Sequence, residues 1–226
     1  MSTLFERTAR ALVHTVRRSQ ESVPRRRSCL FRPRPSLAGL ISGLTFVALL
    51  AGMPTAGADT AAGSTGGDFT LQSVEGPVSL GDHRGKVVLL FFGYTSCPDI
   101  CPLSLLRIGN CLSSLEEEQA ERVSALFITL DPDRDTVERM DQYAGFFHPG
   151  IVGLTGGAEA IDDVTARYGI TWERKKAPAS ALGYSIAHPD TILLVDADGT
   201  LAGEVRGEDG GEALRARVLE LLARRG

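Results

Sequence analysis

The amino-acid sequence predicts an α/β fold in which a mixed β-sheet is flanked by helices and preceded by a β-hairpin. Three observations lead to this prediction. Two short, continuous apolar runs at residues 86–92 and 123–130 are typical of strands that are covered on both faces. A stretch with apolar residues at helical spacing follows each run, which indicates parallel strand–helix–strand units. Two further strand-like runs flank Asp198-Gly199, a dipeptide that favours an antiparallel hairpin.

Residues 1–58 are expected to lie outside this fold and to direct export. They carry nine Arg and only two acidic residues, and an uncharged, mostly apolar run at 37–53 precedes Ala56-Gly57-Ala58. A basic region, an apolar region and an A-x-A site in this order are typical of a secretory signal. The run also reaches the length of a retained membrane anchor. Arg-rich leaders serve mitochondrial import as well, but the A-x-A site favours bacterial export, with the body on the periplasmic side of the inner membrane.

The body of the chain is expected to be one domain on a tether. Residues 59–67 are small and rich in Gly, Ala and Thr, which predicts a flexible tether to a domain at 68–226. The whole chain has 226 residues and is 43% hydrophobic, which suits one ordinary core plus accessory segments.

Beyond residue 58 the chain is acidic, with 15 basic and 26 acidic residues. Such an acidic body argues against nucleic-acid binding, which needs a basic face for the phosphates.

The elements of the domain begin with the small hairpin. Residues 69–73 alternate like a half-buried strand, and Glu75-Gly76 offers a turn into a second short strand at 78–80. Residues 86–92 should form the central strand of the sheet. The chain is then expected to enter a helix at about 99–118, with Pro102 in the first turn, where a missing N–H costs little.

The second half of the domain continues this alternation. After the strand at 123–130, Asp135 is the expected N-cap of a helix. Residues 173–182 are expected to form an exposed loop in which Lys175 and Lys176 are solvated. The remaining predictions are a strand at 151–154, a helix at 158–168, strands at 191–195 and 201–205, and a helix at 209–225. A strand–Cys–helix unit and a hairpin before a C-terminal helix together indicate a thioredoxin-like arrangement.

Two of the four cysteines, Cys97 and Cys101, form the first candidate site. They lie four residues apart at the junction of a strand and a helix. The N-terminus of a helix lowers the pKa of a thiol, so both thiolates should be favoured near neutral pH. The spacing suits two sulfurs on one metal ion, and it also permits closure to a disulfide bond. The C-x-x-x-C pattern alone does not decide between a metal site, a redox pair and an inert pair.

The residues around this pair are similar to those of a known family. Residues 92–102 read Phe-Gly-Tyr-Thr-Ser-Cys-Pro-Asp-Ile-Cys-Pro, and they closely resemble the hallmark segment of the Sco/SenC family, the copper chaperones of cytochrome c oxidase assembly. Further stretches match in order at 85–88 and 130–136, and His188 precedes a matching segment that ends at 195–199. The resemblance spans roughly residues 67–222. It implies that Cys97, Cys101 and His188 bind copper.

The donor set is consistent with this resemblance. Two thiolates and one imidazole suit Cu(I), whereas a closed zinc site would need a fourth ligand that the sequence does not identify. The resemblance therefore implies a metallochaperone rather than an enzyme, which delivers Cu(I) to the binuclear copper centre of cytochrome c oxidase. Its partners would be the copper-receiving subunit of a terminal oxidase and, in addition, other copper chaperones or thiol reductants.

Two other functions remain open at this point. A thiol-disulfide oxidoreductase that acts on the oxidase subunit or other exported proteins would use Cys97 and Cys101 as its redox pair, but it would not require His188. A peroxiredoxin-like peroxidase is a third interpretation that the fold permits. The motif offers no dedicated peroxidatic arrangement for it.

One position departs from the family pattern. Members often carry an acidic residue directly before the histidine, where this chain has Ala187. A carboxylate there could orient the imidazole, so its loss would weaken Cu(II) binding or shift the role toward redox chemistry. Asp190 and Asp131 are the candidates to replace it, and Asp131 equally suits a turn before Pro132.

The other chemically active residues have simpler explanations. Cys29 lies in the leader, and Cys111 is expected to be a buried, inert thiol. His83 and His148 are expected at the surface. Residues 116–118, three consecutive Glu, are expected to be a solvated helix end.

Overall fold

The computed structural model describes residues 66–178 and 180–224, so the predicted signal or anchor at 1–58 and most of the predicted tether lie outside the described residues. The first elements are β1 (Thr70–Ser73), β2 (Gly76–Ser79), a 3-10 turn (Leu80–His83), β3 (Val87–Gly93) and α2 (Ile100–Ser113). They are followed by α3 (Glu117–Ala120), β4 (Val123–Thr129), α4 (Val137–Phe147), β5 (Ile151–Leu154) and α5 (Ala158–Arg167). The last are β6 (Glu173–Lys176), β7 (Tyr184–Ala187), β8 (Thr191–Val195), β9 (Leu201–Arg206), a 3-10 turn (Gly207–Asp209) and α6 (Gly210–Ala223).

Five strands form the central sheet, in the order β5-β4-β3-β8-β9. β3 pairs in parallel with β4, and β4 pairs in parallel with β5. β8 runs antiparallel to both β3 and β9. Every residue of β3 is buried, which explains its continuous apolar sequence and its central place. The predicted mixed sheet, its central strand and the C-terminal hairpin are confirmed.

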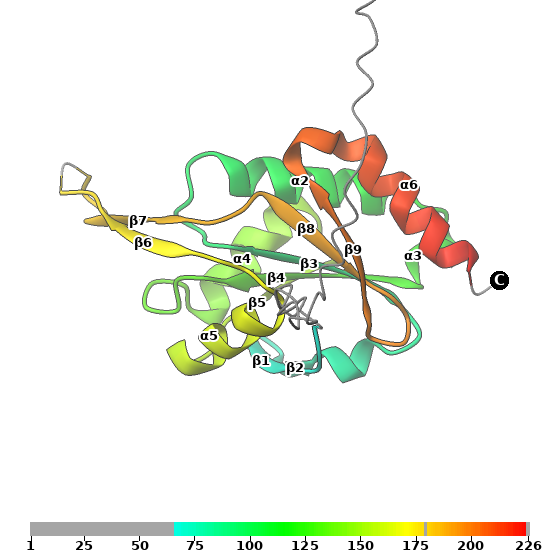
Figure 1. Cartoon of the computed structure of the whole chain (residues 1–226), viewed down its shortest axis with the longest axis horizontal. Coiled ribbons are helices and arrows are strands. Elements are labelled where there is room, and N and C mark those ends of the chain that lie inside the picture. The colour runs from blue at the N-terminus through cyan, green and yellow to red at the C-terminus, as the bar shows by residue number, and fades with distance from the viewer. Residues whose placement is uncertain (1–65, 179, 225–226) are drawn as a thin grey trace, which may run out of the picture. The chain divides into compact units, whose positions relative to one another are not determined.

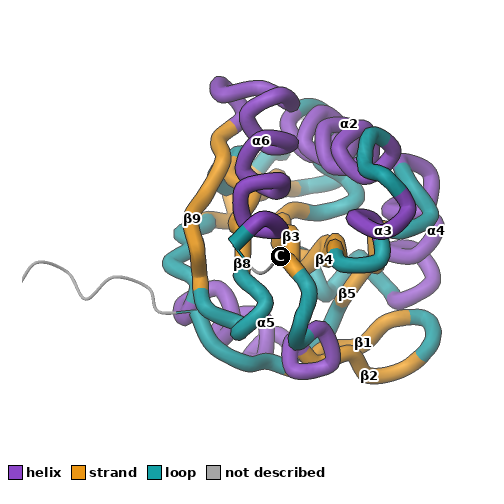
Figure 2. The backbone as a smooth tube through the Cα atoms, turned by 90° about the vertical axis from the view of Figure 1, so that its right-hand side faces the viewer, coloured by secondary structure: helices purple, strands orange, loops and turns teal. Residues whose placement is uncertain are grey.

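Helices cover both faces of this sheet, as predicted. α2 packs against α6 and α4 on one side, and α5 lies on the other side (Figure 1 and Figure 2). Between these layers the core contains large side chains such as Phe91, Leu105 and Phe127, which expose no surface. The N-terminal β1–β2 hairpin joins the protein through paired backbone hydrogen bonds of 2.8 and 2.9 Å between Gln72 and Thr155. The architecture is that of a thioredoxin-like fold.

The helix predicted at 99–118 ends earlier than expected. α2 stops at Ser113, where the carbonyl of Cys111 accepts from the hydroxyl of Ser114 at 2.7 Å and from its N–H at 3.1 Å, so the helix end is hydrogen-bonded locally. The N–H of Glu116 then donates to the side chain of Gln119 at 3.1 Å, which caps the separate helix α3. The three Glu residues are exposed, as predicted, but they begin a second helix instead of ending the first.

The loop predicted at 173–182 is wrong in its first half. β6 pairs with β7 in an antiparallel hairpin, with Arg174 opposite Ile186. All four side chains of β6 are exposed, so no apolar alternation marks it as a strand. The hairpin is held by Tyr184, whose ring lies 3.8 and 4.3 Å from the guanidinium groups of Arg134 and Arg174. It projects from the body of the protein in Figure 1 and leads directly into His188.

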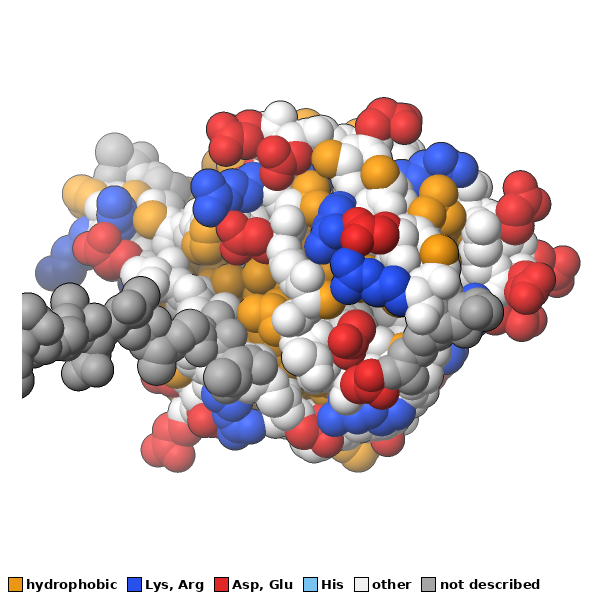
Figure 3. Space-filling view, turned by 45° about the vertical axis from the view of Figure 1, so that its right-hand side comes forward, with side chains coloured by type: hydrophobic (Ala, Val, Ile, Leu, Met, Phe, Trp, Pro, Cys, Tyr) orange, Lys and Arg blue, Asp and Glu red, His pale blue; other side chains and the backbone are white. Residues whose placement is uncertain are grey.

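The surface of the described residues carries both signs of charge. On the face seen in Figure 3, acidic and basic side chains are interspersed, and apolar side chains reach the surface between them. Within the described residues no helix has the length and apolar character that crossing a bilayer requires.

At the N-terminal hairpin, Leu80 lies in the 3-10 turn after β2 and not in the strand that was expected to include it.

Candidate metal centre

The junction between β3 and α2 places both cysteines at one edge of the sheet. β3 ends at Gly93, and the N–H of Cys97 then donates to the carbonyl of Tyr94 at 3.2 Å, which closes a turn. α2 begins at Ile100, so Cys101 and the following proline lie in its first turn, as predicted. Cys97 exposes 8% of its surface, whereas Cys101 exposes none. The pair therefore has an outer and an inner sulfur.

The inner sulfur fits because the last residue of β3 is a glycine. A Cβ atom at Gly93 would lie 2.5 Å from Sγ of Cys101 and 3.1 Å from the ring of Phe127. The first distance is shorter than any Cβ contact that a protein tolerates. A larger residue at this position would therefore push the sulfur away from its place.

Asp135 has a different role from the N-cap that the sequence predicts. α4 is capped by Thr136, whose hydroxyl accepts from the N–H of Arg139 at 3.3 Å. The side chain of Asp135 turns inward, and the residue exposes 1% of its surface. Asp and Thr are both good capping residues, so two of them in a row before a helix leave the sequence pattern ambiguous.

Asp135 instead anchors the loop that carries Cys97. Its carboxylate accepts from the N–H and the hydroxyl of Thr95, at 3.0 and 2.5 Å, and from the hydroxyl of Thr129 at 2.7 Å. Arg139 adds to this network by donating to the hydroxyl of Thr95 at 2.6 Å. Hydrogen bonds to a buried carboxylate are strong, so they fix the start of the cysteine loop independently of any metal.

His188 approaches the cysteines on the segment between β7 and β8. Strand β7 is tied to the cysteine loop, because Ile186 donates its N–H to the hydroxyl of Tyr94 at 3.3 Å. The imidazole ring stands edge-on to the rings of Tyr94 and Phe91, with centroids 5.9 and 6.2 Å apart. These aromatic contacts form one wall of the site.

The structure brings all three predicted site residues together. Nε2 of His188 lies 3.3 Å from Sγ of Cys101, which is 87 positions away in the sequence. This nitrogen and the sulfurs of Cys97 and Cys101 lie within 4.8 Å of one another. Both cysteines are free thiols. Over residues 66–178 and 180–224, no other group of three His, Cys, Asp or Glu side chains converges in this way.

A backbone carbonyl orients the imidazole. Nδ1 of His188 lies 3.0 Å from the carbonyl oxygen of Pro189. A carbonyl oxygen only accepts hydrogen bonds, so Nδ1 carries the proton and, in the neutral ring, Nε2 directs its lone pair toward the sulfurs. The tautomer that a metal ligand needs is thus selected without a carboxylate at Ala187.

The two thiols titrate as an unequal pair. The hydrogen bond from Cys101 lowers the pKa of Cys97 to about 3 against the effect of burial. The same hydrogen bond, together with burial, raises the pKa of Cys101 well above its usual value. The expectation of two thiolates near neutral pH is therefore wrong for Cys101, because its hydrogen bond with Cys97 and its burial outweigh the helix N-terminus. At neutral pH the pair holds one proton and one negative charge.

The donor set fits a small ion that prefers sulfur. Three donors that lie at about 2.0–2.3 Å from one ion, in one plane, are about 3.5–4 Å apart. The observed separations, 3.3 Å between Cys101 and His188 and at most 4.8 Å for the other pairs, differ only slightly from this arrangement. Two sulfurs and one imidazole nitrogen favour Cu(I) over hard cations. The proton on Cys101 would leave when the ion binds.

Neither Asp131 nor Asp190 contacts the imidazole of His188. Asp131 is fully buried, accepts from the hydroxyl of Tyr184 at 2.6 Å and forms an ion pair with Arg134. It is therefore more than a turn residue, because it ties the β6–β7 hairpin to the end of β4. Asp190 bonds to Ser104 and Arg107 of α2.

The remaining sequence candidates lie away from the three donors. Cys111 is buried, as predicted, and burial raises its pKa to about 11. The prediction of surface positions for His83 and His148 is confirmed only in part, because both are half-buried. Nδ1 of His83 lies 3.0 Å from the hydroxyl of Ser124, and Nδ1 of His148 accepts from the N–H of Gly150 at 2.9 Å.

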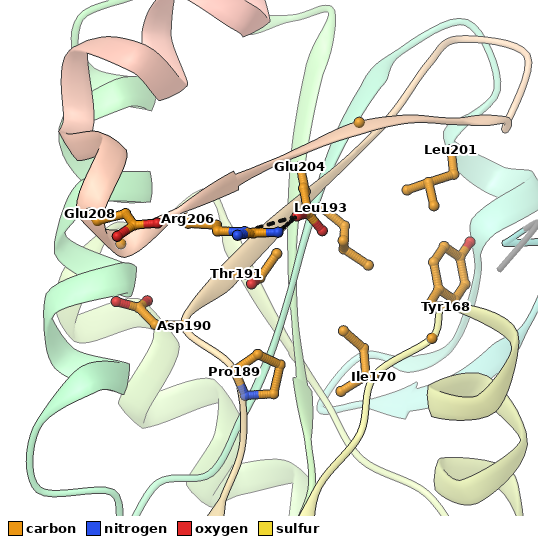
Figure 4. A pocket seen from close by; sticks show the side chains of 13 residues that line it. Tyr168, Ile170, Pro189, Asp190, Thr191, Leu193, Leu201, Glu204, Arg206 and Glu208 are labelled. Carbon is orange, nitrogen blue, oxygen red and sulfur yellow. Dashed lines mark hydrogen bonds and ion pairs between the residues drawn. The ribbon is translucent and has the colours of Figure 1, made fainter. Parts of the chain in front are cut away.

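A groove of about 660 Å³ borders the segment that follows His188 (Figure 4). Leu193, Leu201 and Tyr168 contribute apolar side chains to it, and the ion pair between Arg206 and Glu204, at 2.8 Å, lies along it. Neither cysteine of the site lines the groove. It is therefore distinct from the metal centre.

Comparisons with known proteins point to one family. The family profile described as SCO1/SenC matches residues 57–223. Protein SCO2 homolog, mitochondrial, of Bos taurus is 42% identical over 135 residues, which are 59% of this chain and 50% of that protein. An SCO2-like protein of Rickettsia prowazekii is 38% identical over 135 residues, which are 59% of this chain and 65% of that protein. The match thus spans between half and two thirds of these curated relatives.

Solved structures of the same family have the same fold. ScoI of Arabidopsis thaliana with copper bound is 29% identical, with a TM-score of 0.65, and the match covers 70% of this chain and 98% of that one. ScoI of Bradyrhizobium japonicum with copper bound is 34% identical, with a TM-score of 0.62, and the match covers 69% and 98%. The profile match over most of the chain, together with these relatives, shows that the chain belongs to the SCO1/SenC family.

Proposed function

We propose that this protein binds Cu(I) through Cys97, Cys101 and His188 and delivers it to the copper-receiving subunit of a terminal oxidase while the binuclear copper centre is assembled. The convergence of two sulfurs and one imidazole nitrogen within 4.8 Å carries the proposal. Two relatives with the same fold were solved with copper bound, which supports copper as the cargo. The Sco family is one of cytochrome c oxidase assembly proteins, which supports an oxidase as the recipient.

The unequal exposure of the donors suggests how the ion leaves. Three ligands leave Cu(I) open to a further ligand from a partner. Cys97 is the more accessible sulfur and Cys101 is fully buried, so a recipient's thiolate or imidazole would add on the Cys97 side. Protein ligands are then replaced one at a time, with Cys101 released last. As the ion departs, Cys101 takes back its proton.

The same pair of thiols also supports thiol-disulfide exchange as a second function. Cys97, with its lowered pKa, is a thiolate that can attack a disulfide of an exported protein. The attack forms a mixed disulfide and releases one thiolate of the partner. Cys101 then gives up its proton and attacks the sulfur of Cys97, so the pair becomes a disulfide and the second sulfur of the partner is released. The two reduced sulfurs of the partner take up the proton from Cys101 and one proton from water. This reaction needs neither a metal ion nor His188.

The proposed setting is the periplasmic side of a bacterial inner membrane. Residues 1–58 would act as a cleaved signal or as a retained anchor, and 59–67 as the tether of the domain at 68–226. The order of a basic region, an apolar run and an A-x-A site supports this assignment.

Anaerobic Cu(I) titration of the reduced protein against a competing chelator tests the proposal. Wild type should bind about one ion per domain, and His188→Ala and Cys97→Ser should each lose at least about tenfold in affinity. His148→Ala is a matched control, because this half-buried histidine bonds to the N–H of Gly150 and lies outside the donor group. It should bind Cu(I) like wild type.

Two outcomes would count against the chaperone. Unchanged affinity in His188→Ala would reject the three-ligand site. Rapid reduction of a disulfide substrate by that same variant, free of metal, would favour the oxidoreductase.

A further inference from the structure

Asp190 connects the segment after His188 to the helix that carries Cys101. The hydroxyl of Ser104 donates to its carboxylate, and the guanidinium group of Arg107 forms an ion pair with it at 3.2 Å. Ser104 is fully buried. The side chains of Asp190 and Arg107 expose 25% and 24% of their surface. The carboxylate is therefore held at two successive turns of α2.

The protein is shaped to receive this carboxylate. The N–H of Gly207 donates to the backbone carbonyl of Asp190 at 2.9 Å. A Cβ atom at position 207 would overlap the carboxylate, so the glycine leaves the space that Asp190 occupies. Figure 4 shows the side chain of Asp190 directed toward α2 and away from Pro189.

These contacts complete a closed ring of bonded residues that includes the metal centre. Ser104 lies one turn of α2 after Cys101, Ser104 donates a hydrogen bond to Asp190, and Asp190 lies two residues after His188 in the chain. The ring of residues closes where Nε2 of His188 lies 3.3 Å from Sγ of Cys101. Without the bonds of Asp190 to Ser104 and Arg107, the imidazole of His188 would keep its contact with the carbonyl of Pro189, but the segment that carries it would lose these bonds to α2.

We propose that Asp190 is a positioning residue of the metal centre. Its bonds to Ser104 and Arg107, called the latch here, attach the His188 segment to α2 and so hold Nε2 of the imidazole close enough to Sγ of Cys101 for both to bind one metal ion. The proposal rests on the Cu(I) site proposed above. Asp190 does not touch the imidazole, whose tautomer is set by the carbonyl of Pro189. The carboxylate therefore acts on the position of the ring. It stands three positions after Ala187, where the chain lacks the acidic residue that family members often carry.

Cu(I) affinity of the reduced full-length protein, measured by chelator competition, tests the latch. Asp190→Ala should lose about tenfold, as residues that orient metal ligands commonly do. Asp190→Asn keeps an acceptor for Ser104 but loses the charge that pairs with Arg107, and it should lose less. Glu208→Ala is the matched control, because Glu208 is an exposed acidic residue that lines the same groove. It should bind like wild type.

A double-mutant cycle with His188→Ala separates positioning from general loosening. If Asp190 acts through the imidazole, Asp190→Ala should cost less than about twofold in the His188→Ala background. An equal loss in both backgrounds would overturn the latch. Should Asp190→Ala fold poorly, Ser104→Ala removes one bond of the latch, keeps the ion pair with Arg107, and should follow the same pattern in the cycle.

A readout on the metal-free protein completes the test. The imidazole nitrogen resonances of His188 should broaden or shift in Asp190→Ala and stay in place in Glu208→Ala. Wild-type affinity in Asp190→Ala, beside weakened binding in His188→Ala, would overturn the latch and leave the Cu(I) function intact. Wild-type affinity in His188→Ala as well would mean that the proposed function itself has failed.

Discussion

At the scale of single residues, the two cysteines have separate roles. Cys101 is fully buried, its sulfur lies against the backbone of Gly93, and its raised pKa keeps its proton in place at neutral pH. Cys97 is slightly exposed and has a lowered pKa. The spacing of the pair in the sequence predicts that they meet, but not that they differ. The difference in pKa comes first from the hydrogen bond between the two thiols and then from burial, which depends on what packs over α2.

Gly93→Ala tests whether the inner sulfur needs its space. The added methyl group should displace Sγ of Cys101 and lower Cu(I) affinity by at least about tenfold. Overpacking of this kind also costs about 1–3 kcal/mol of unfolding free energy. Chelator competition and urea unfolding measure the two effects.

Gly145→Ala, in α4, is the control for Gly93→Ala. Nothing lies within 4 Å of the added methyl group at Gly145. Alanine is the better helix former, so this change should stabilise the protein by about 0.5–1 kcal/mol and leave Cu(I) affinity unchanged. Wild-type affinity in Gly93→Ala would show that the sulfur is free to move.

The titration of the pair predicts the pH dependence of Cu(I) binding. Cys97, with a pKa lowered to about 3, is already ionised at neutral pH, and Cys101, with a raised pKa, is not. Binding therefore releases one thiol proton, and Cu(I) affinity should rise about tenfold per unit between pH 7 and pH 8. Chelator competition at several pH values measures the slope. A rise of about a hundredfold per unit would show that both thiols release a proton.

At the scale of elements, strands that are covered on both faces could be predicted, and the two strands of the β6–β7 hairpin could not. β3 and β4 are covered on both faces, so their sequences are continuous apolar runs. β6 has no buried side chain, and it is a strand because its backbone pairs with that of β7. Contacts of the ring of Tyr184 with Arg134 and Arg174 hold the pair together, and such contacts between distant residues leave no local pattern.

Tyr184→Phe tests what holds the hairpin. The change removes the hydrogen bond to the fully buried carboxylate of Asp131 and should cost about 1–3 kcal/mol of unfolding free energy in urea. Tyr143→Phe is the matched control, because the buried hydroxyl of Tyr143 has no hydrogen-bond partner among the described residues. Its removal should leave stability unchanged or raise it. Equal losses in both variants would mean that the bond to Asp131 contributes nothing specific.

At the scale of the whole molecule, the site depends on a contact that sequence spacing does not contain. A thioredoxin-like sheet follows from apolar runs and turn residues, and the nearness of Cys97 to Cys101 follows from their spacing. His188 joins them from 87 positions away, and only the resemblance to a family predicts that it does. The same limit applies to Asp135, whose bonds to Thr95 and Thr129 replace the local capping role that the sequence favours.

Because its ligands come from distant parts of the chain, a bound ion should also cross-link the fold. Cu(I) at a free concentration about a hundredfold above its dissociation constant adds about 2.7 kcal/mol to the unfolding free energy. For a domain of this size that gain raises Tm by about 5–10 °C. The rise should be largest in wild type and small in His188→Ala, where the ion would connect only Cys97 and Cys101, four residues apart on one segment. Thermal unfolding under anaerobic conditions, with and without Cu(I), measures it. An equal rise in both proteins would show that the ion is held by the cysteines alone and that the segment carrying His188 is not drawn onto α2 by the metal.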